Sequence, residues 1–226
     1  MKWQHLFTFV AFASLFAASN AQTQSTDYFT GFYGGFEAGT ISYNTQITFD
    51  DVDDPAGRGG AGYGALLGYN HTHEKLLVGA ELVFNLASTP GPYTFDPAVT
   101  GFAELDLRRG ASAGLDTRVG YLVIERILLY GSIGYSTNKQ SVRIDGVPLE
   151  QFAGGAGDKT FGTFQFGAGL EMAIHPVLGI RFSFRSLSGY DLNATDFGTI
   201  PTDASLTRFD VEPGHLQFLG GLMFRF

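Results

Sequence analysis

The sequence predicts an all-β protein: an eight-stranded antiparallel transmembrane β-barrel that follows a cleaved signal peptide. Three observations predict this fold: a short apolar segment at the N-terminus, repeated segments in which apolar and polar residues alternate, and connections that alternate between short and long. We expect a signal peptide over residues 1–21 and a single barrel domain over residues 22–226.

The N-terminal segment has the three parts of a secretory signal. Lys2 provides a cation, an apolar run extends from Leu6 to Ala18, and Ser19-Asn20-Ala21 places small residues at the two positions that signal peptidase reads. The apolar run is too short to cross a bilayer comfortably, so we expect cleavage before Gln22 rather than a retained anchor.

The composition excludes several classes of protein. Cysteine is absent, which rules out disulfides and cysteine-based metal or nucleophilic sites. Only 16% of residues are charged, yet no stretch after Ala21 is apolar over the length that a membrane helix requires. Removal of Lys2 with the signal leaves 13 cations against 22 anions, a formal charge of −9, which disfavours nucleic acid as a partner.

Alternation with a period of two is the main secondary-structure signal. It is clearest from Leu216 to Phe226, where every second residue is Leu, Phe or Gly and the residues between them are mixed and polar. Such segments are bounded by Gly, Pro, Asp and Asn, as strands are. The eight predicted strands cover about residues 31–43, 60–70, 76–86, 106–123, 127–137, 161–174, 178–188 and 213–226.

The connections between these strands alternate in length. Short ones occupy residues 70–75, 124–126 and 175–177, whereas those after the first, third, fifth and seventh strands have roughly 15 to 25 residues rich in Asp, Gly, Pro and Thr. Short periplasmic turns and long extracellular loops are typical of outer-membrane barrels. An even number of strands returns the C-terminus to the side of the short turns.

Alternation alone also fits a soluble β-sandwich, so the residue types on the two faces of the strands must distinguish the two folds. The face predicted to point outward carries aromatic residues toward strand ends, which favours a membrane interface: Tyr69, Tyr121, Tyr135 and Phe226. The other face carries charges in mid-strand, and in a narrow eight-stranded lumen opposite charges pair. The predicted lumen ion-pair network comprises Glu37, Glu81, Asp116, Arg118, Glu171, Arg181, Arg185 and Arg225.

Several short patterns occur in an order that resembles one family. They are Thr30-Gly31-Phe32-Tyr33, Leu67-Gly68-Tyr69-Asn70, Gly79-Ala80-Glu81, Arg118-Val119-Gly120-Tyr121, Leu129-Tyr130-Gly131, Gly167-Ala168-Gly169-Leu170-Glu171 and Phe224-Arg225-Phe226. The chain resembles the OmpA-like eight-stranded outer membrane protein β-barrel family, in particular its small proteobacterial members that carry the name porin. The segment Ser88–Asp106 lacks a clear family pattern, and the peptidoglycan-binding domain of full-length relatives is not expected here.

The resemblance implies a location in the bacterial cell outer membrane. It also implies that the terminal aromatic residue, Phe226, is the signal by which the barrel-assembly machinery recognises the chain during biogenesis. The other expected partners are outer-membrane lipid, lipopolysaccharide and extracellular ligands of the long loops.

No residue pattern predicts catalysis, a cofactor or a metal site. Some barrels of this size modify lipid A with a His and a Ser near the outer rim, but His71, His73 and His175 fall in predicted periplasmic turns. His215, near the outer end of the last strand, has no Ser alternating with it and is expected to be a solvated rim residue. Two acidic groups are interpreted as hydrated loop or turn residues rather than Ca²⁺ ligands: Asp50, Asp51, Asp53 and Asp54, and Asp191, Asn193 and Asp196.

The leading functional hypothesis is a structural and surface-interaction protein whose lumen is closed by ion pairs, since eight strands leave room only for side chains. The alternative is a small porin that passes ions or small solutes. A lipid A-modifying enzyme is the distant alternative.

Overall fold

The computed structural model describes residues 28–49, 52–87, 93–94, 104–144, 147–148, 158–188, 192–193 and 209–226. The predicted signal peptide, residues 1–21, lies outside these ranges and stays a prediction. Within them, no helix is both long and apolar enough to cross a membrane.

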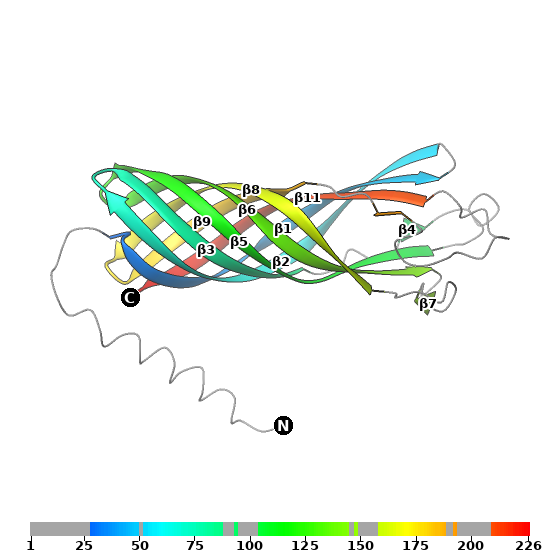
Figure 1. Ribbon diagram of the computed structural model, residues 1–226, viewed down its shortest axis with the longest axis horizontal. Helices are drawn as coiled ribbons and strands as arrows, with labels where there is room; N and C mark the ends of the chain where they lie inside the picture. Colours follow the sequence, from blue (N-terminus) through cyan, green and yellow to red (C-terminus); the bar gives the residue numbers. More distant parts are fainter. Residues whose placement is uncertain are drawn as a thin grey trace, which may run out of the picture.

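Eight long strands and three two-residue strands form one sheet in the described ranges (Figure 1). The long strands are β1 (Gly31–Phe49), β2 (Val52–His73), β3 (Leu76–Ala87), β5 (Glu104–Ile124), β6 (Ile127–Ile144), β8 (Asp158–His175), β9 (Leu178–Leu187) and β11 (Phe209–Arg225). The short ones are β4 (Tyr93–Thr94), β7 (Val147–Pro148) and β10 (Leu192–Asn193).

The sheet closes on itself because β1 pairs with both its sequence neighbour β2 and the last strand, β11. Every pairing between long strands is antiparallel, and the β1–β11 ladder runs from Tyr33 opposite Arg225 to Phe49 opposite Phe209. Closure pairs the backbone groups of the edges, which is what a sheet inside hydrocarbon requires. The predicted eight-stranded antiparallel barrel is confirmed.

The tight turns Glu74-Lys75, Glu125-Arg126 and Pro176-Val177 share one end of the barrel with the C-terminus (Figure 1). We call this the turn end and the opposite end the loop end. The predicted short connections are therefore right in position, but the strands run further into them: His71 and His73 lie in β2, paired with Val78 and Leu76.

At the loop end the prediction of a long first connection is wrong. β1 and β2 stay paired up to Phe49 opposite Val52, so only two residues join them. Asp53 and Asp54, expected in a loop, are strand residues, and Asn193 belongs to β10; Asp50, Asp51, Asp191 and Asp196 lie outside the described residues. The Asp- and Gly-rich composition predicted a loop, but beyond the membrane a hairpin needs only its backbone ladder and no apolar face.

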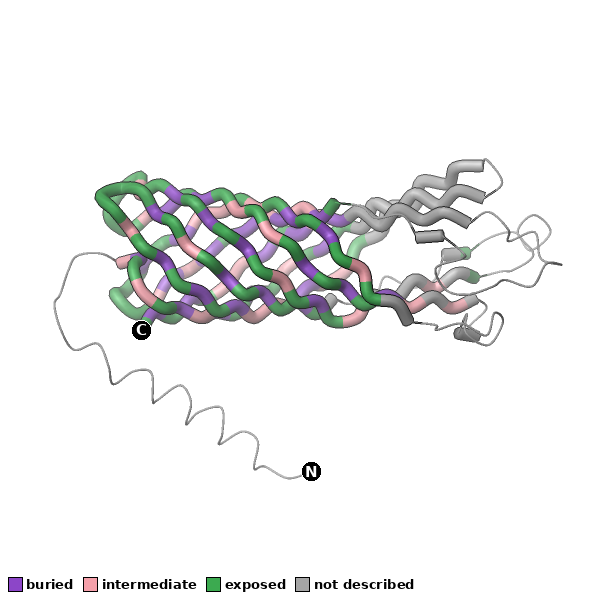
Figure 2. Tube along the Cα trace, viewed as in Figure 1, coloured by how far each residue is buried: buried purple, intermediate pink, exposed green. Residues whose placement is uncertain are grey.

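Burial alternates along the strands (Figure 2). On β3, Glu81 is 3% exposed while the next residue, Leu82, is 45% exposed. The exposed side carries the large apolar residues, and the four aromatic residues predicted to face outward are all exposed. The apolar face of the sheet therefore points away from the lumen, opposite to the arrangement in a soluble sandwich.

Candidate functional site in the barrel lumen

The lumen of the barrel contains all eight charged residues predicted for it. Each is at most 8% exposed, and the set holds four acids and four arginines. Their charges therefore balance, which is the condition under which ionised groups can be buried at moderate cost.

Two glutamates and two arginines form the centre of the network. Arg181 donates to Glu81 Oε2 at 2.7 Å and to Glu171 Oε2 at 3.1 Å, so its guanidinium bridges β3 and β8 across the lumen. Arg118 reaches the same two carboxylate oxygens at 3.4 and 3.3 Å. Arg225 donates to the remaining oxygen of Glu171 at 2.6 Å. These contacts link β3, β5, β8, β9 and β11 into one cluster.

Two tyrosines complete this cluster; the sequence placed them in the family patterns but not among the predicted lumen residues. The hydroxyl of Tyr33 donates to Glu81 Oε2 at 2.7 Å and accepts from Arg118 at 2.9 Å. The ring of Tyr130 lies under the Arg118 guanidinium, whose Cζ is 4.0 Å from the ring centroid. Glycines make room for both rings: a Cβ at Gly68 would come within 2.5 Å of Tyr33, and one at Gly169 would clash with Tyr130. In both cases the tyrosine pairs with a glycine on the neighbouring strand, and both residues face inward. This pairing is the signal by which the two tyrosines could have been identified.

A second group of contacts lies next to the central cluster. Arg185 donates to Glu37 Oε2 at 2.7 Å, and Ser183 donates to the other oxygen of that carboxylate at 3.0 Å. Arg185 also lies 3.6 Å from Glu81, which connects the two groups. Asp116 differs from the other acids, because its hydrogen-bond donor is the amide of Gln165 rather than an arginine.

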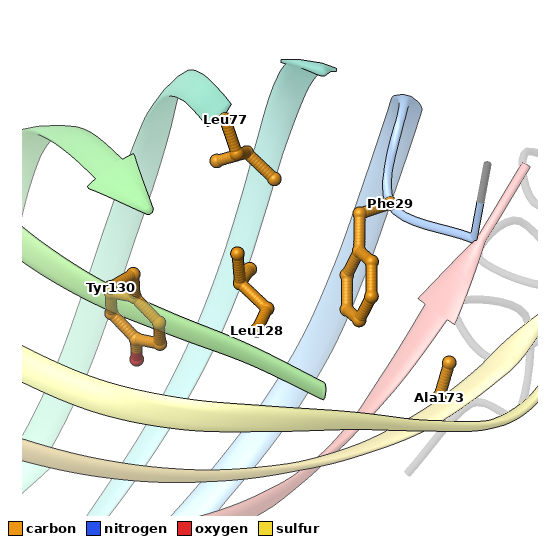
Figure 3. Packing of buried hydrophobic residues seen from close by; sticks show 5 residues of the cluster. All are labelled: Phe29, Leu77, Leu128, Tyr130 and Ala173. Carbon is orange, nitrogen blue, oxygen red and sulfur yellow. The ribbon is translucent and has the colours of Figure 1, made fainter. Parts of the chain in front are cut away.

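An apolar plug fills the lumen at the turn end (Figure 3). Phe29, which precedes β1, is 1% exposed and points into the space shared with Leu77, Leu128, Tyr130 and Ala173. The Arg225 guanidinium lies 4.7 Å from the Phe29 ring centroid, so the plug contacts the ion-pair network directly. Phe29 could not be identified from the sequence because it lies outside the alternating segments.

The chain before β1 is held in place by further contacts at the turn end. Arg126 donates to the hydroxyl of Tyr28 at 3.1 Å, and the backbone N–H of Thr72 donates to Thr30 Oγ1 at 3.0 Å. Tyr28 itself packs partly buried against the plug. Three consecutive residues therefore fix the entry to β1 across the end of the barrel.

The loop half of the lumen holds buried polar residues that carry no formal charge, among them Asn85, Gln165 and Gln217. Buried atoms without a hydrogen-bond partner occur here and in the turn half alike: Asn85 Oδ1, Gln165 Oε1 and Gln217 Nε2 here, and Asn70 Oδ1, Arg118 Nε and Arg225 Nη1 there. Such groups are normally satisfied by water, and what distinguishes the loop half is that its buried amides carry no charge.

His215 belongs to this half, and the expectation of a solvated rim histidine is wrong. It is 6% exposed and alternates inward with Gln217 on β11. The rim prediction failed because β11 begins at Phe209 and continues beyond this histidine. Among the residues the structure describes, no group of three or more His, Cys, Asp or Glu side chains could hold a metal ion.

Comparison with solved structures finds barrels of the outer membrane at low sequence identity. Neisserial surface protein A is 14% identical, with a TM-score of 0.44 over 87% of this chain and 98% of that one. The attachment invasion locus protein Ail of Yersinia pestis, solved with the heparin analogue sucrose octasulfate, is 13% identical, with a TM-score of 0.39 over 86% and 100%. The outer membrane protease OmpT of Escherichia coli is 9% identical, with a TM-score of 0.42 over 92% and 100%.

Comparison with curated proteins finds no match. A family model, however, covers most of the chain: residues 8–200 match the outer membrane protein beta-barrel domain. This match confirms the predicted location in the outer membrane and places the apolar outer face of the barrel in lipid. The chain is thus an integral outer-membrane β-barrel and belongs to the outer membrane protein beta-barrel family.

Proposed function

We propose that this protein is a closed structural barrel that displays its loop-end hairpins as an interaction surface and does not conduct solutes. The observation that carries the closed state is the continuous filling of the turn half of the lumen. The apolar plug around Phe29 and the arginine–glutamate cluster lie in sequence along the lumen and contact each other through Arg225.

Several features support a permanent rather than a gated closure. Arg118 and Arg181 are 1% and 0% exposed, and each contacts two carboxylates on different strands. Moving one guanidinium aside would leave buried charges without partners, which costs about 3 to 5 kcal/mol. Eight-stranded barrels have an interior that side chains fill, in contrast to the water-filled channels of larger porins.

Planar-bilayer recording of the refolded protein tests the closed state. We expect no discrete conductance steps under conditions in which a water-filled porin, added as a positive control, gives them. Folding of the inserted protein is checked by its shifted mobility on unheated electrophoresis gels. Reproducible steps from the folded protein would overturn the proposal.

A narrow porin is the second candidate, and one observation favours it: the loop half of the lumen holds buried polar atoms without partners, such as Gln217 Nε2. Water entering from the loop end would satisfy them. On this reading the lumen is a polar vestibule that ends at the central cluster, and conduction would require that cluster to open.

The surface role is proposed from the loop end of the barrel. β1 and β2 form a hairpin that continues well past the closed body, and β5 and β6 do the same (Figure 1). Extracellular ligands of these hairpins are the partners to seek. Replacing residues 46–55 by a two-residue turn should leave the folded barrel and its outer-membrane insertion unchanged while removing any cell-surface binding that the wild type confers.

The finer family likeness, to OmpA-like small proteins that carry the name porin, and the absence of catalysis are part of this proposal. The order of the motifs in the sequence supports the likeness. Lipid A mass spectra from cells with and without the protein test the catalytic question, because a lipid A-modifying enzyme would change them and a structural barrel would not.

A further inference from the structure

A groove opens on the lipid-facing surface of the barrel where β3 and β5 separate. The last paired residues of these strands are Asn85 and Ser112. β3 continues to Ala87 with partners on β2, while β5 carries a bulge in which Gly110 and Ala111 lie opposite a single residue of β6, Lys139. A bulge bends its strand away from the regular ladder, so the seam between β3 and β5 widens here.

The groove has a volume of about 670 Å³, within the range of about 300–1,000 Å³ found for sites of small molecules. Small residues leave its space open, and four large, exposed apolar residues border it. The small ones include Ala65, Ala111 and Ala113, and the large ones are Phe36, Tyr63, Phe84 and Leu86.

Asn85 ends the ladder beside this groove, but its side chain points into the lumen, where Gly64 faces it. The polar side chains that the groove offers a ligand are therefore exposed ones, Thr137, Lys139 and Thr160.

The groove also lies at the border of the apolar band. On β6 the outward residues change from Ile133 and Tyr135 to Thr137 and Lys139, and the last two line the groove. Its lower part therefore faces acyl chains, while its upper part lies at the height of lipid headgroups, where a lysine attracts anionic lipid.

We propose that this groove is a binding site for one anionic membrane lipid. One acyl chain lies against Ala111 and Ala113, between Phe84 and Leu86. The headgroup lies near Lys139. A lipid held at this position covers the seam beyond the end of the β3–β5 ladder. This groove would then be the binding site of the outer-membrane lipid expected as a partner.

The test uses vesicles that contain phosphatidylglycerol with a photoreactive diazirine on one acyl chain. After irradiation of the folded wild-type protein, mass spectrometry of its peptides should place most cross-links on β2, β3 and the β5 segment around Ala113. In Ala113→Phe, which fills the groove, labelling there should fall about tenfold, the factor that corresponds to 1.4 kcal/mol. Ala65→Phe fills the same space from β2 and is the second variant.

Ala168→Phe is the matched control, because Ala168 is exposed on the lipid-facing side of β8 and does not line the groove. Its labelling should equal that of the wild type. Lys139→Gln should remove the preference for phosphatidylglycerol over phosphatidylcholine that carries the same chain. Even labelling around the barrel, or unchanged labelling in both filled variants, would overturn the proposal. Conductance does not enter this test, so its result is independent of the closed lumen.

Discussion

The turn half and the loop half of this barrel enclose different interiors with the same eight strands. In the turn half, Arg181, Arg118 and their glutamates meet the apolar plug, and the strands pair all the way around. In the loop half the lumen is lined by polar residues such as Asn85 and Gln217, and β3 separates from β5. Buried charge is thus concentrated where the wall is closed and many strands converge.

The contrast between the two halves shows where ionised groups stabilise such a fold. A buried arginine is tolerated when two carboxylates from other strands share it, as Glu81 and Glu171 share Arg181. Each such bridge fixes the relative positions of distant strands. Neutral amides need no balancing charge, so water can replace a missing partner in the loop half.

Removal of one bridging arginine should have the largest effect on stability. Arg181→Met keeps the length of the side chain but leaves Glu81 and Glu171 with fewer cations, and we expect a loss of about 3 to 5 kcal/mol in the free energy of unfolding. Urea titration of the protein folded into lipid vesicles measures it. A loss below about 1 kcal/mol, the scale of an exposed ion pair, would show that the cluster is hydrated and that the two halves do not differ.

A charge on the outer face should have the next largest effect. Leu82→Arg places a cation near the middle of β3 on the lipid side and should cost about 2 to 4 kcal/mol. Leu76→Arg makes the same change at the turn end of that strand and should cost about 0 to 1 kcal/mol, because the charge reaches the interface there. The same titration measures both variants, and equal costs would mean that the strand is misplaced in depth.

The strand order and the set of residues that face the lumen could be predicted from the sequence, and the reason is physical. A strand places neighbours on opposite faces, so Glu81 and Leu82 could be assigned once the apolar side was assigned to lipid. The aromatic residues at strand ends and the alternating connections supported that choice. The charged residues of the lumen followed directly from the alternation.

Other features could not be predicted because they depend on contacts between distant segments. Phe29 precedes the first strand, and only the closed barrel brings it to Leu77 and Leu128. The hairpin beyond Tyr43 has no lipid-facing pattern, so its composition indicated a loop. The groove at Ala113 arises from a bulge and from the end of a ladder, which are properties of pairing between strands rather than of any one segment.

Deletion of Phe226 should have a small effect on equilibrium stability and a large one on assembly. Its backbone N–H donates to the carbonyl of Phe32 at 3.0 Å, and loss of one such bond costs about 0.5 to 1.5 kcal/mol. We expect export to continue while insertion into the outer membrane slows, as pulse-labelled cells followed by fractionation would show. Insertion at the wild-type rate would contradict the role of this residue as the assembly signal.

Replacing an amide in the loop half should have the smallest effect on stability, and it allows the most direct comparison of the two halves. Gln217 is 1% exposed and its Nε2 atom has no partner, so Gln217→Met removes a buried donor without breaking a bond to that atom. Because an unsatisfied group costs free energy and an apolar replacement of similar shape does not, the change should lie between zero and about 1 kcal/mol of stabilisation. Arg181→Met and Gln217→Met introduce the same residue into the two halves of one lumen, on strands that pair directly. A loss of several kcal/mol from Gln217→Met would mean that ordered water in the loop half holds that amide as tightly as carboxylates hold the arginine.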